Sequence, residues 1–280
     1  MATVVALCEL GWRAEAALRR TRGAGEVLAV LRGSLYLTVD AERGGTELIW
    51  LGAAGAALHG RAVVTAGRLP DVEPGEIVEL DARGGRVWRP RPAAFSAATG
   101  EPRSSGRALM AALGSSAPRS SFGALMAGVP LAFPLERATA PARALAEACA
   151  GDDAEGAAMA AVELLGLGPG LTPAGDDFVG GAFFARAQLA TRPREGPTRW
   201  AQAAAAVVDA ARGRTHPISL ALLTDLVGGH GHAPLHELSH ALAGRAPLAH
   251  TLDTARRVTR IGHSSGWDML AGFVLGMGEP

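Results

Sequence analysis

The chain has 280 residues, and its 27 basic and 27 acidic side chains give a formal net charge of zero. Domains that bind nucleic acid usually carry a basic surplus, so we expect no nucleic-acid partner. Hydrophobic residues make up 48% of the chain, which argues against disorder. No apolar run approaches the roughly 18 residues that a bilayer span needs, so no membrane partner is expected. Two cysteines, Cys8 and Cys149, cannot form a disulfide framework or a four-thiolate metal site. These features predict a soluble, cytoplasmic globular protein.

Residues 1–92 have the pattern of a β-rich module. Short runs rich in β-branched and other apolar residues alternate with turns that carry glycine or proline. The predicted strands are Gly25–Leu31, Leu35–Asp40, Glu47–Leu51, Ala62–Ala66, Ile77–Asp81 and Arg86–Trp88. Short strands at this spacing are typical of a small antiparallel barrel or sandwich.

The composition changes after the β-rich module. Residues 93–121 are rich in Pro, Arg, Ser and Gly, which predicts a connecting segment with one short helix near Arg107 to Leu113. Residues 122–280 carry apolar side chains at three- and four-residue spacing, which predicts a helical domain. The predicted helices are Ala142–Ala150, Glu155–Leu165, Asp176–Ala190, Thr198–Arg212, Ser219–Leu226, Leu235–Ala243, Leu252–Arg260 and Trp267–Gly276. The expected fold class is α+β, with a β-barrel-like N-terminal module followed by a mostly helical C-terminal domain.

A glycine-rich stretch, Gly166 to Asp177, joins two of the predicted helices. It does not follow a strand, and Asp176 stands where a Walker lysine would follow Gly175, so neither nucleotide-binding fingerprint fits. Thr172 and Pro173 make a good cap and first-turn pair, and a helix start presents free N–H groups that favour an anion. We therefore predict an anion-binding loop. Its candidate substrate contacts are Gly168, Gly170, Thr172, Gly175 and Asp176.

A second stretch resembles the first, because residues 263–272 can be laid on residues 172–181. The alignment pairs two first-turn glycines, two first-turn aspartates and two helix glycines: Gly175 with Gly266, Asp177 with Asp268, and Gly181 with Gly272. A glycine inside a helix costs about 1 kcal/mol relative to alanine, and close packing would compensate for that cost. We therefore expect the two helices to pack together with their N-termini at one site.

The second stretch supplies further candidate residues. His263, Asp177 and Asp268 are the predicted catalytic side chains, since a histidine pKa near 6.5 suits acid–base chemistry. The carboxylates would repel a bare anion. We therefore expect them to orient His263, to bind a substrate amide or ammonium, or to hold Mg²⁺ as a bridge to the anion. No further carboxylate flanks either stretch, which favours the first two roles. The alternative is that they only complement the helix dipole. The remaining predicted substrate contacts are Ser264, Ser265 and Gly266, of which the serines could also be helix caps or nucleophiles.

A competing motif lies at His236 to His240, which spells the HExxH pattern of zinc hydrolases. On a helix the two imidazoles could share Zn²⁺ while Glu237 polarises water. Ala243 replaces the glycine of the longer metzincin pattern, and Asp253 and His250 are the only plausible third ligands. The simpler interpretation is a surface helix that carries histidines, so we predict no metal ligands.

The glycine motifs also resemble a known family. Gly168 to Asp177, Ser219 and Gly262 to Gly266 look like the AllH-type family, and the resemblance extends over most of the chain. The stretch from Arg214 to Ser219 resembles a Thr-x-x-x-Ser stretch of that family, which adds Ser219 to the predicted substrate contacts. The family often has Ser where this chain has Ala174.

The named member of that family is a subunit of bacterial oxamate carbamoyltransferase, which acts in anaerobic allantoin breakdown. The resemblance implies transfer of a carbamoyl group between oxalurate and phosphate, together with other subunits of the complex. We therefore predict a subunit of a carbamoyltransferase-like enzyme that binds a small anionic carbamoyl or acyl substrate, or phosphate. A non-catalytic binding or assembly subunit is the alternative, and a zinc-dependent hydrolase is the third candidate.

Overall fold

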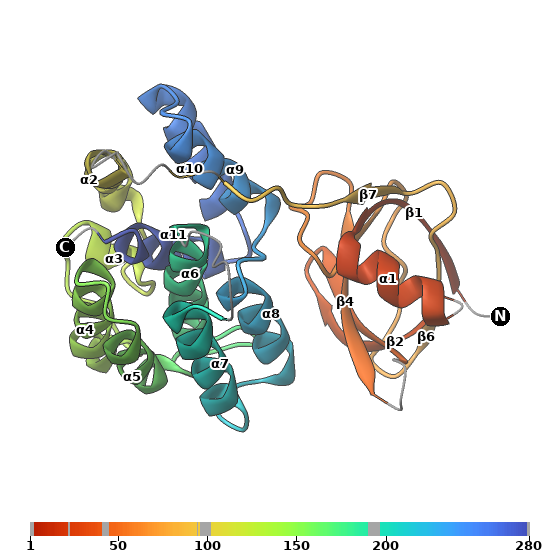
Figure 1. The fold of residues 1–280 in the computed structure, drawn as a ribbon. Coiled ribbons are helices and arrows are strands. Elements are labelled where there is room, and N and C mark those ends of the chain that lie inside the picture. Colours follow the sequence, from red (N-terminus) through yellow and green to blue (C-terminus); the bar gives the residue numbers. More distant parts are fainter. Residues whose placement is uncertain are drawn as a thin grey trace. The chain divides into compact units, whose positions relative to one another are not determined.

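The computed structural model describes residues 3–21, 23–40, 45–93, 95, 102–189 and 197–278. The chain divides into two compact units, Met1–Arg91 and Pro92–Pro280. The first is a closed β-barrel and the second is helical (Figure 1), so the predicted α+β class is confirmed. In the described ranges, no helix is long and apolar enough to cross a membrane.

Six strands close the barrel in the order β5-β4-β3-β2-β6-β1, because β1 also pairs with β5. The strands are β1 (Thr3–Gly11), β2 (Ala24–Leu31), β3 (Ser34–Asp40), β4 (Thr46–Ala53), β5 (Ala62–Thr65), β6 (Ile77–Asp81) and β7 (Arg86–Trp88). The last of these, β7, adds to β1 in parallel. The sheet is mixed rather than antiparallel as predicted, because β1–β6 and β4–β5 are parallel pairs.

Helix α1 (Trp12–Thr21) completes the interior of the barrel. Its Ala14, Ala17 and Leu18 are buried in the same apolar cluster as the inward side chains of the strands. These strand residues alternate with exposed ones, for instance in β2, where Val27 is buried between exposed neighbours. This alternation is the period of two that lets a strand present one face to a core.

The second unit is built from helices. They are α2 (Pro102–Leu113), α3 (Gly123–Met126), α4 (Thr139–Ala150), α5 (Ala154–Leu164), α6 (Ala174–Leu189), α7 (Arg199–Ala211), α8 (Pro217–Val227), α9 (Ala233–Ala243), α10 (Leu248–Thr259) and α11 (Ser265–Gly276). Two 3₁₀ turns, Gly114–Ser116 and Glu136–Ala138, lie among them. Each helix predicted after residue 140 is present, with bounds that differ by a few residues.

Polar residues define where several of these helices begin. Asp153 caps α5 by accepting a hydrogen bond from the Gly156 amide at 3.0 Å. Thr198 caps α7 in the same way, with Ala201 as donor at 3.1 Å. Such caps satisfy amides that have no partner inside the helix, and each stabilises a helix by about 1 kcal/mol.

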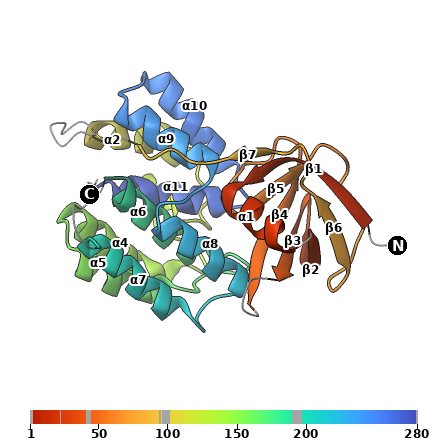
Figure 2. The same cartoon turned by 45° about the vertical axis from the view of Figure 1, so that its right-hand side comes forward.

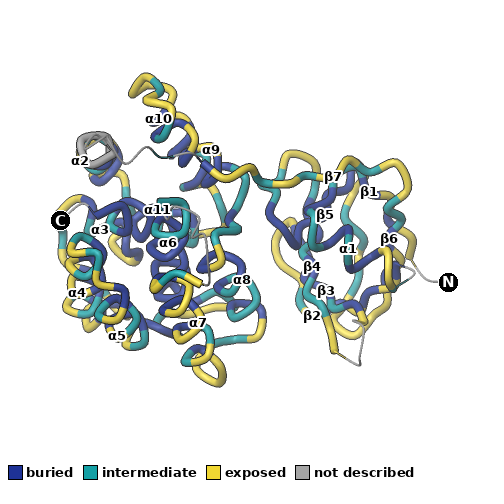
Figure 3. The backbone as a smooth tube through the Cα atoms, in the orientation of Figure 1, coloured by how far each residue is buried: buried dark blue, intermediate teal, exposed yellow. Residues whose placement is uncertain are grey.

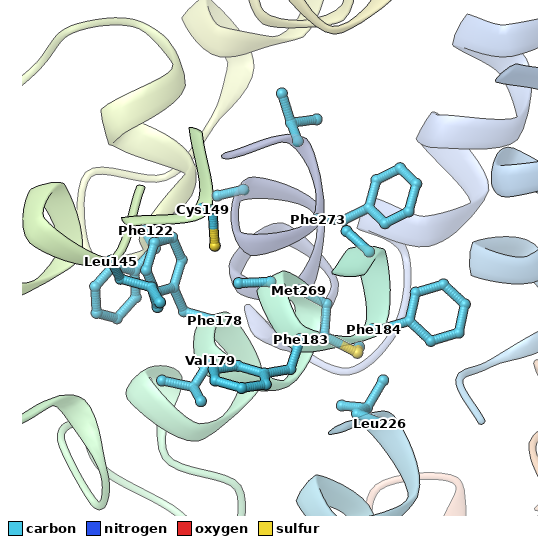
Figure 4. Close-up of a cluster of buried hydrophobic side chains, with 14 of the residues drawn as sticks. Phe122, Leu145, Cys149, Phe178, Val179, Phe183, Phe184, Leu226, Met269 and Phe273 are labelled. Carbon is cyan, nitrogen blue, oxygen red and sulfur yellow. The ribbon is translucent and has the colours of Figure 1, made fainter. Parts of the chain in front are cut away.

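Helices α6 and α11 lie in the middle of this unit, with α2, α9 and α10 on one side and α4, α5 and α7 on the other (Figures 1 and 2). The first twelve residues of α6, from Ala174 to Ala185, are all buried, as the dark tube in Figure 3 shows. Aromatic side chains fill the space around the two helices (Figure 4). Phe122 stacks on Phe178 with ring centroids 4.4 Å apart.

The predicted connecting segment enters this helical core. Leu109 and Leu113 of α2 are buried in the same apolar cluster as α6 and α11. Helix α2 also begins at Pro102, earlier than the predicted short helix near Arg107. Part of residues 93–121 therefore packs as helix rather than running over the surface. Residues 94 and 96–101 lie outside the described part of the chain.

Candidate functional site

The two motif copies bring α6 and α11 into close backbone contact. A Cβ atom on Gly181 would lie 2.2 Å from the carbonyl oxygen of Met269, and one on Gly272 would lie 1.9 Å from that of Phe178. These contacts are reciprocal, because Gly181 aligns with Gly272 and Phe178 aligns with Met269. Only a residue without a side chain permits this approach of backbone to backbone. The expected close packing of α6 on α11 is therefore present.

The starts of α6 and α11 meet at the same end of this helix pair. The hydroxyl oxygens of Thr172 and Ser265 are 3.2 Å apart, although 93 positions separate them in the sequence. The Ser265 hydroxyl also hydrogen-bonds to Asp177 in the first turn of α6. Both loops therefore contribute polar groups to one location.

Glycine is required in the two loops for two different structural reasons. Gly168 and Gly170 have φ values of 109° and 95°, a region that favours glycine. The first-turn glycines instead allow close helix approach, since a Cβ atom would lie 1.9 Å from the Leu164 carbonyl oxygen at Gly175 and 2.1 Å from that of Val258 at Gly266.

The amides of these first-turn glycines are also occupied. Gly175 N–H donates to the carbonyl of Leu167 and Gly266 N–H donates to that of Ile261, each at 2.9 Å. Two of the backbone donors expected to bind an anion are therefore used within their own loops.

Asp176 is held inside the protein by three donors. Its Oδ1 accepts a hydrogen bond from Gly166 N–H at 2.8 Å, and its Oδ2 accepts from the hydroxyls of Ser219, at 2.6 Å, and Thr215. Asp176 and Ser219 are both buried. These bonds fasten the glycine-rich loop to the start of α8. Both predicted substrate contacts thus have partners within the protein.

Asp177 and Asp268 occupy equivalent positions and share unusual surroundings. They are 6% and 0% exposed. Asp268 Oδ1 accepts a hydrogen bond from the Phe122 amide at 2.6 Å. The Oδ2 atom of each carboxyl is buried without a hydrogen-bond partner among the residues that the structure describes. An unpaired buried oxygen is costly, and more so when it is charged, so these atoms require an explanation.

Burial changes the acidity of both carboxyls. It raises the pKa of Asp177 well above its ordinary value, nearby Asp268 and Asp176 raise it further, and the bond from Ser265 opposes them. Burial also raises the pKa of Asp268 to about 7, against hydrogen bonds from the Phe122 amide and Ser264. Neutral carboxyls do not repel an anion. Burial therefore favours the neutral form of Asp177 and Asp268, which weakens the repulsion that these two residues would present to an anion.

The serines and histidine before α11 differ in their surroundings. Ser264 occupies the cap position of α11, but its side chain makes no capping bond and instead hydrogen-bonds to Asp268. His263 is exposed. Across the described ranges, no hydrogen bond joins His263 to Asp177 or Asp268. The expected orientation of His263 by these carboxyls is therefore not found.

The HExxH stretch lies on α9 and has partners of its own. His236 is buried, its Nε2 accepts a hydrogen bond from Gly231 N–H at 3.1 Å, and its ring packs edge-on against Phe184. Glu237 forms an ion pair with Arg257 at 2.5 Å. No group of three His, Cys, Asp or Glu residues that could hold a metal occurs in the described part of the chain. These contacts do not fit a zinc site, since the Nε2 lone pair of His236 is already used.

A known protein family matches this same region of the chain. Residues 164–277 match the AllH family. The family is described as oxamate carbamoyltransferase subunit AllH, and the matched residues begin at the last residue of α5 and end just after α11. The predicted resemblance is confirmed for that segment, which holds both motif copies but neither the barrel nor the first helices of the second unit. No curated protein and no solved structure matches the chain.

Two residues at the site were not predicted from the sequence. Phe122 supplies its amide to Asp268 from 146 positions away, so no local pattern could have indicated it. Thr215 could have been found, because it is the threonine of the Thr-x-x-x-Ser stretch that ends at Ser219. Thr215 lies just before the cap residue of α8 and Ser219 in its first turn, and both hydroxyls reach the same carboxylate oxygen.

Proposed function

We propose that this chain is a subunit of a carbamoyltransferase-like enzyme of the oxamate carbamoyltransferase type. It would bind a small anionic carbamoyl or acyl compound, or phosphate, where the starts of α6 and α11 meet. The AllH match supports this proposal because it contains both helix starts. The match is to a subunit, so other subunits of a carbamoyl- or acyl-transfer complex are the proposed partners.

The observation that carries the proposal is the pair of buried carboxyls. Asp177 and Asp268 each keep one buried oxygen without a hydrogen-bond partner in the described residues, at the crossing inside the matched segment. Leaving such an atom unpaired costs about 1–3 kcal/mol, so its presence in both motif copies favours a functional reason. Perturbed carboxyl pKa values also cluster at functional sites.

The chemistry of carbamoyl transfer requires a proton at the leaving nitrogen. When phosphate attacks the carbamoyl carbon of oxalurate, a C–O bond forms, the C–N bond breaks, and the released oxamate nitrogen takes a proton. Asp268, with a pKa of about 7, is suited to supply it through Ser264, and the proton lost by phosphate restores the carboxyl. We assign this role to Asp268 rather than to His263.

A non-catalytic binding subunit is the second candidate. Within the part of the chain that the structure describes, burial, other carboxyls and hydrogen-bond donors act on the acidity of Asp177 and Asp268, and no arginine or lysine is among these groups. Phosphoryl and carboxylate groups are usually stabilised by such cations during reaction. A partner subunit would then complete the site with a basic side chain.

The test uses the purified full chain. Binding of oxamate, carbamoyl phosphate and inorganic phosphate is measured by calorimetry, and carbamoyl transfer is assayed with the chain alone and with the products of neighbouring genes. Asp268→Asn should abolish transfer, while Asp253→Asn, which alters an exposed carboxylate on α10, should not change it. Binding without transfer by the chain alone supports the second candidate. A folded chain that binds none of the three compounds refutes the proposal.

A further inference from the structure

A chain of hydrogen-bonded hydroxyls leads from the interior to the meeting point of the two loops. Asp177 is buried and hydrogen-bonds to Ser265, whose hydroxyl oxygen lies 3.2 Å from that of Thr172. Ser265 and Thr172 are both half-buried. Each hydroxyl has one proton to donate, so all bonds in such a chain must point the same way.

Whether Asp177 is ionised or neutral decides the direction in which these hydrogen bonds point. An ionised Asp177 can only accept, so Ser265 would donate to it, Thr172 would donate to Ser265, and Thr172 would offer a lone pair outward. A neutral Asp177 can donate to Ser265, which then donates to Thr172. The Thr172 proton would then point outward. A carboxylic acid kept neutral by its surroundings is a known source of a donated hydrogen bond in enzymes.

The surroundings of Asp177 favour the neutral form. The charged groups that act on it are both acidic, Asp176 on its own helix and Asp268 on α11, and burial acts in the same direction. The hydrogen bond from Ser265 and the positive ends of α6 and α11 oppose them. The oxygen Oδ2 of Asp177 has no hydrogen-bond partner within the described ranges, which a neutral carboxyl tolerates better than a carboxylate.

We propose that Asp177 is a positioning residue: through Ser265 it turns the Thr172 hydroxyl outward, where this hydroxyl donates a hydrogen bond to an anionic oxygen of the bound substrate. This series of hydrogen bonds therefore selects a ligand with an anionic carboxylate or acyl oxygen next to Thr172. A ligand that offers only N–H groups there would find a competing donor. This inference rests on the proposed function, since it concerns the same site.

The test measures oxamate binding by calorimetry between pH 5 and pH 9, where the charge of oxamate does not change. Binding to the unmodified protein should weaken as the pH rises through the titration of Asp177. Asp177→Asn supplies an amide that can donate to Ser265 at every pH, so its affinity should stay nearly constant over the range. Thr172→Val removes the terminal donor and should weaken binding by about 10-fold to 100-fold at low pH, as expected for one hydrogen bond to a charged group.

Two controls separate this role from a structural one. Thr172→Ser keeps the hydroxyl and should restore the pH profile. Thr139→Val removes a hydroxyl at the start of α4 that bonds to the Glu136 carbonyl of the preceding 3₁₀ turn, and this variant should bind oxamate as the unmodified protein does. Melting temperatures of all variants identify any that fail to fold.

The possible outcomes are distinct. If the pH dependence of oxamate binding persists unchanged in Asp177→Asn, the inference is wrong while the proposed function stands. If Thr172→Val binds as tightly as the unmodified protein, the inference is also wrong. If oxamate does not bind at any pH, the inference is wrong, and the proposed function fails only if carbamoyl phosphate and inorganic phosphate do not bind either.

Discussion

The contact between α6 and α11 predicts that a glycine-to-alanine substitution there lowers the free energy of unfolding, whereas the same substitution in an exposed helix usually raises it. In an exposed helix, Gly→Ala stabilises by about 1 kcal/mol because alanine has the higher helix propensity. At Gly272 the new Cβ atom would lie 1.9 Å from the carbonyl oxygen of Phe178 and 3.0 Å from the amide nitrogen of Ala182. Both neighbours are backbone atoms of a buried helix, so neither can rotate away.

The magnitude follows from the movement that the clash requires. Ordinary contact begins at 3.4 Å, so the helices would have to separate by about 1.5 Å at this point. A gap of even 0.5–1 Å forfeits about a quarter to a half of the dispersion energy between the facing atoms. Overpacking of this kind costs about 3 kcal/mol, of which the propensity gain returns about 1. The net loss of about 2 kcal/mol corresponds to a fall in melting temperature of about 4–8 °C for a unit of this size.

The assay is thermal and urea unfolding of the full chain, followed by far-ultraviolet circular dichroism. Gly180→Ala is the matched control, because it lies in α6 but its Cβ atom would meet only the side chain of Leu226, at 2.6 Å. That side chain can shift, so the control should lose less stability than Gly272→Ala. The reasoning is refuted if Gly272→Ala is as stable as the unmodified protein, or if the two variants lose the same free energy of unfolding.

Four further predictions concern the same unit. Ala174 aligns with Ser265, so the hydroxyl that Ala174→Ser introduces should donate a hydrogen bond to Asp268. This bond should raise the free energy of unfolding by about 1 kcal/mol and lower the pKa of Asp268. A loss of stability in urea unfolding would contradict this prediction. Burial raises the pKa of Asp268 in the folded state to about 7, above the ordinary value for an aspartate, so the folded state binds the proton more tightly. Stability should therefore fall as pH rises from 4 to 7. Asp268→Asn should flatten that part of the pH profile, and an unchanged slope would assign the effect to another group. The pKa of His236 is lowered to about 4, so its contribution to stability should be lost as pH falls from 6.5 to 4, and His236→Gln should reduce that loss. Zinc should leave the melting temperature unchanged, whereas a rise that disappears in His240→Ala would restore the metal interpretation.

Much of the fold could be predicted because its elements have local causes. The strands after residue 24 are bounded by turn residues, and the helices after residue 140 carry apolar side chains at helical spacing. The first strand was missed because β1 runs directly into α1 without a separating turn. The parallel pairing of β4 with β5 was also missed, since strand direction depends on contacts between segments rather than on the residues of either.

The site divides in the same way. The repeated pattern of loop, glycine and first-turn aspartate was visible in the sequence, and it correctly predicted that α6 and α11 pack together. It did not show that Asp176 is hydrogen-bonded to Thr215 and Ser219, or that His263 is exposed while Asp177 and Asp268 are buried. Residue type shows which bonds a side chain can make, but its neighbours decide which bonds it makes.

The amino-acid sequence alone determined the order of the elements, the two glycine motifs and the close approach of their helices, because each follows from the period and the side-chain size of nearby residues. Only the tertiary structure decided the chemical state of Asp177 and Asp268. Both lie in first helical turns, where an exposed aspartate would be ionised and would complement the helix dipole. Burial inside the helical unit removes them from water, and the cost of burying a charge then favours the proton.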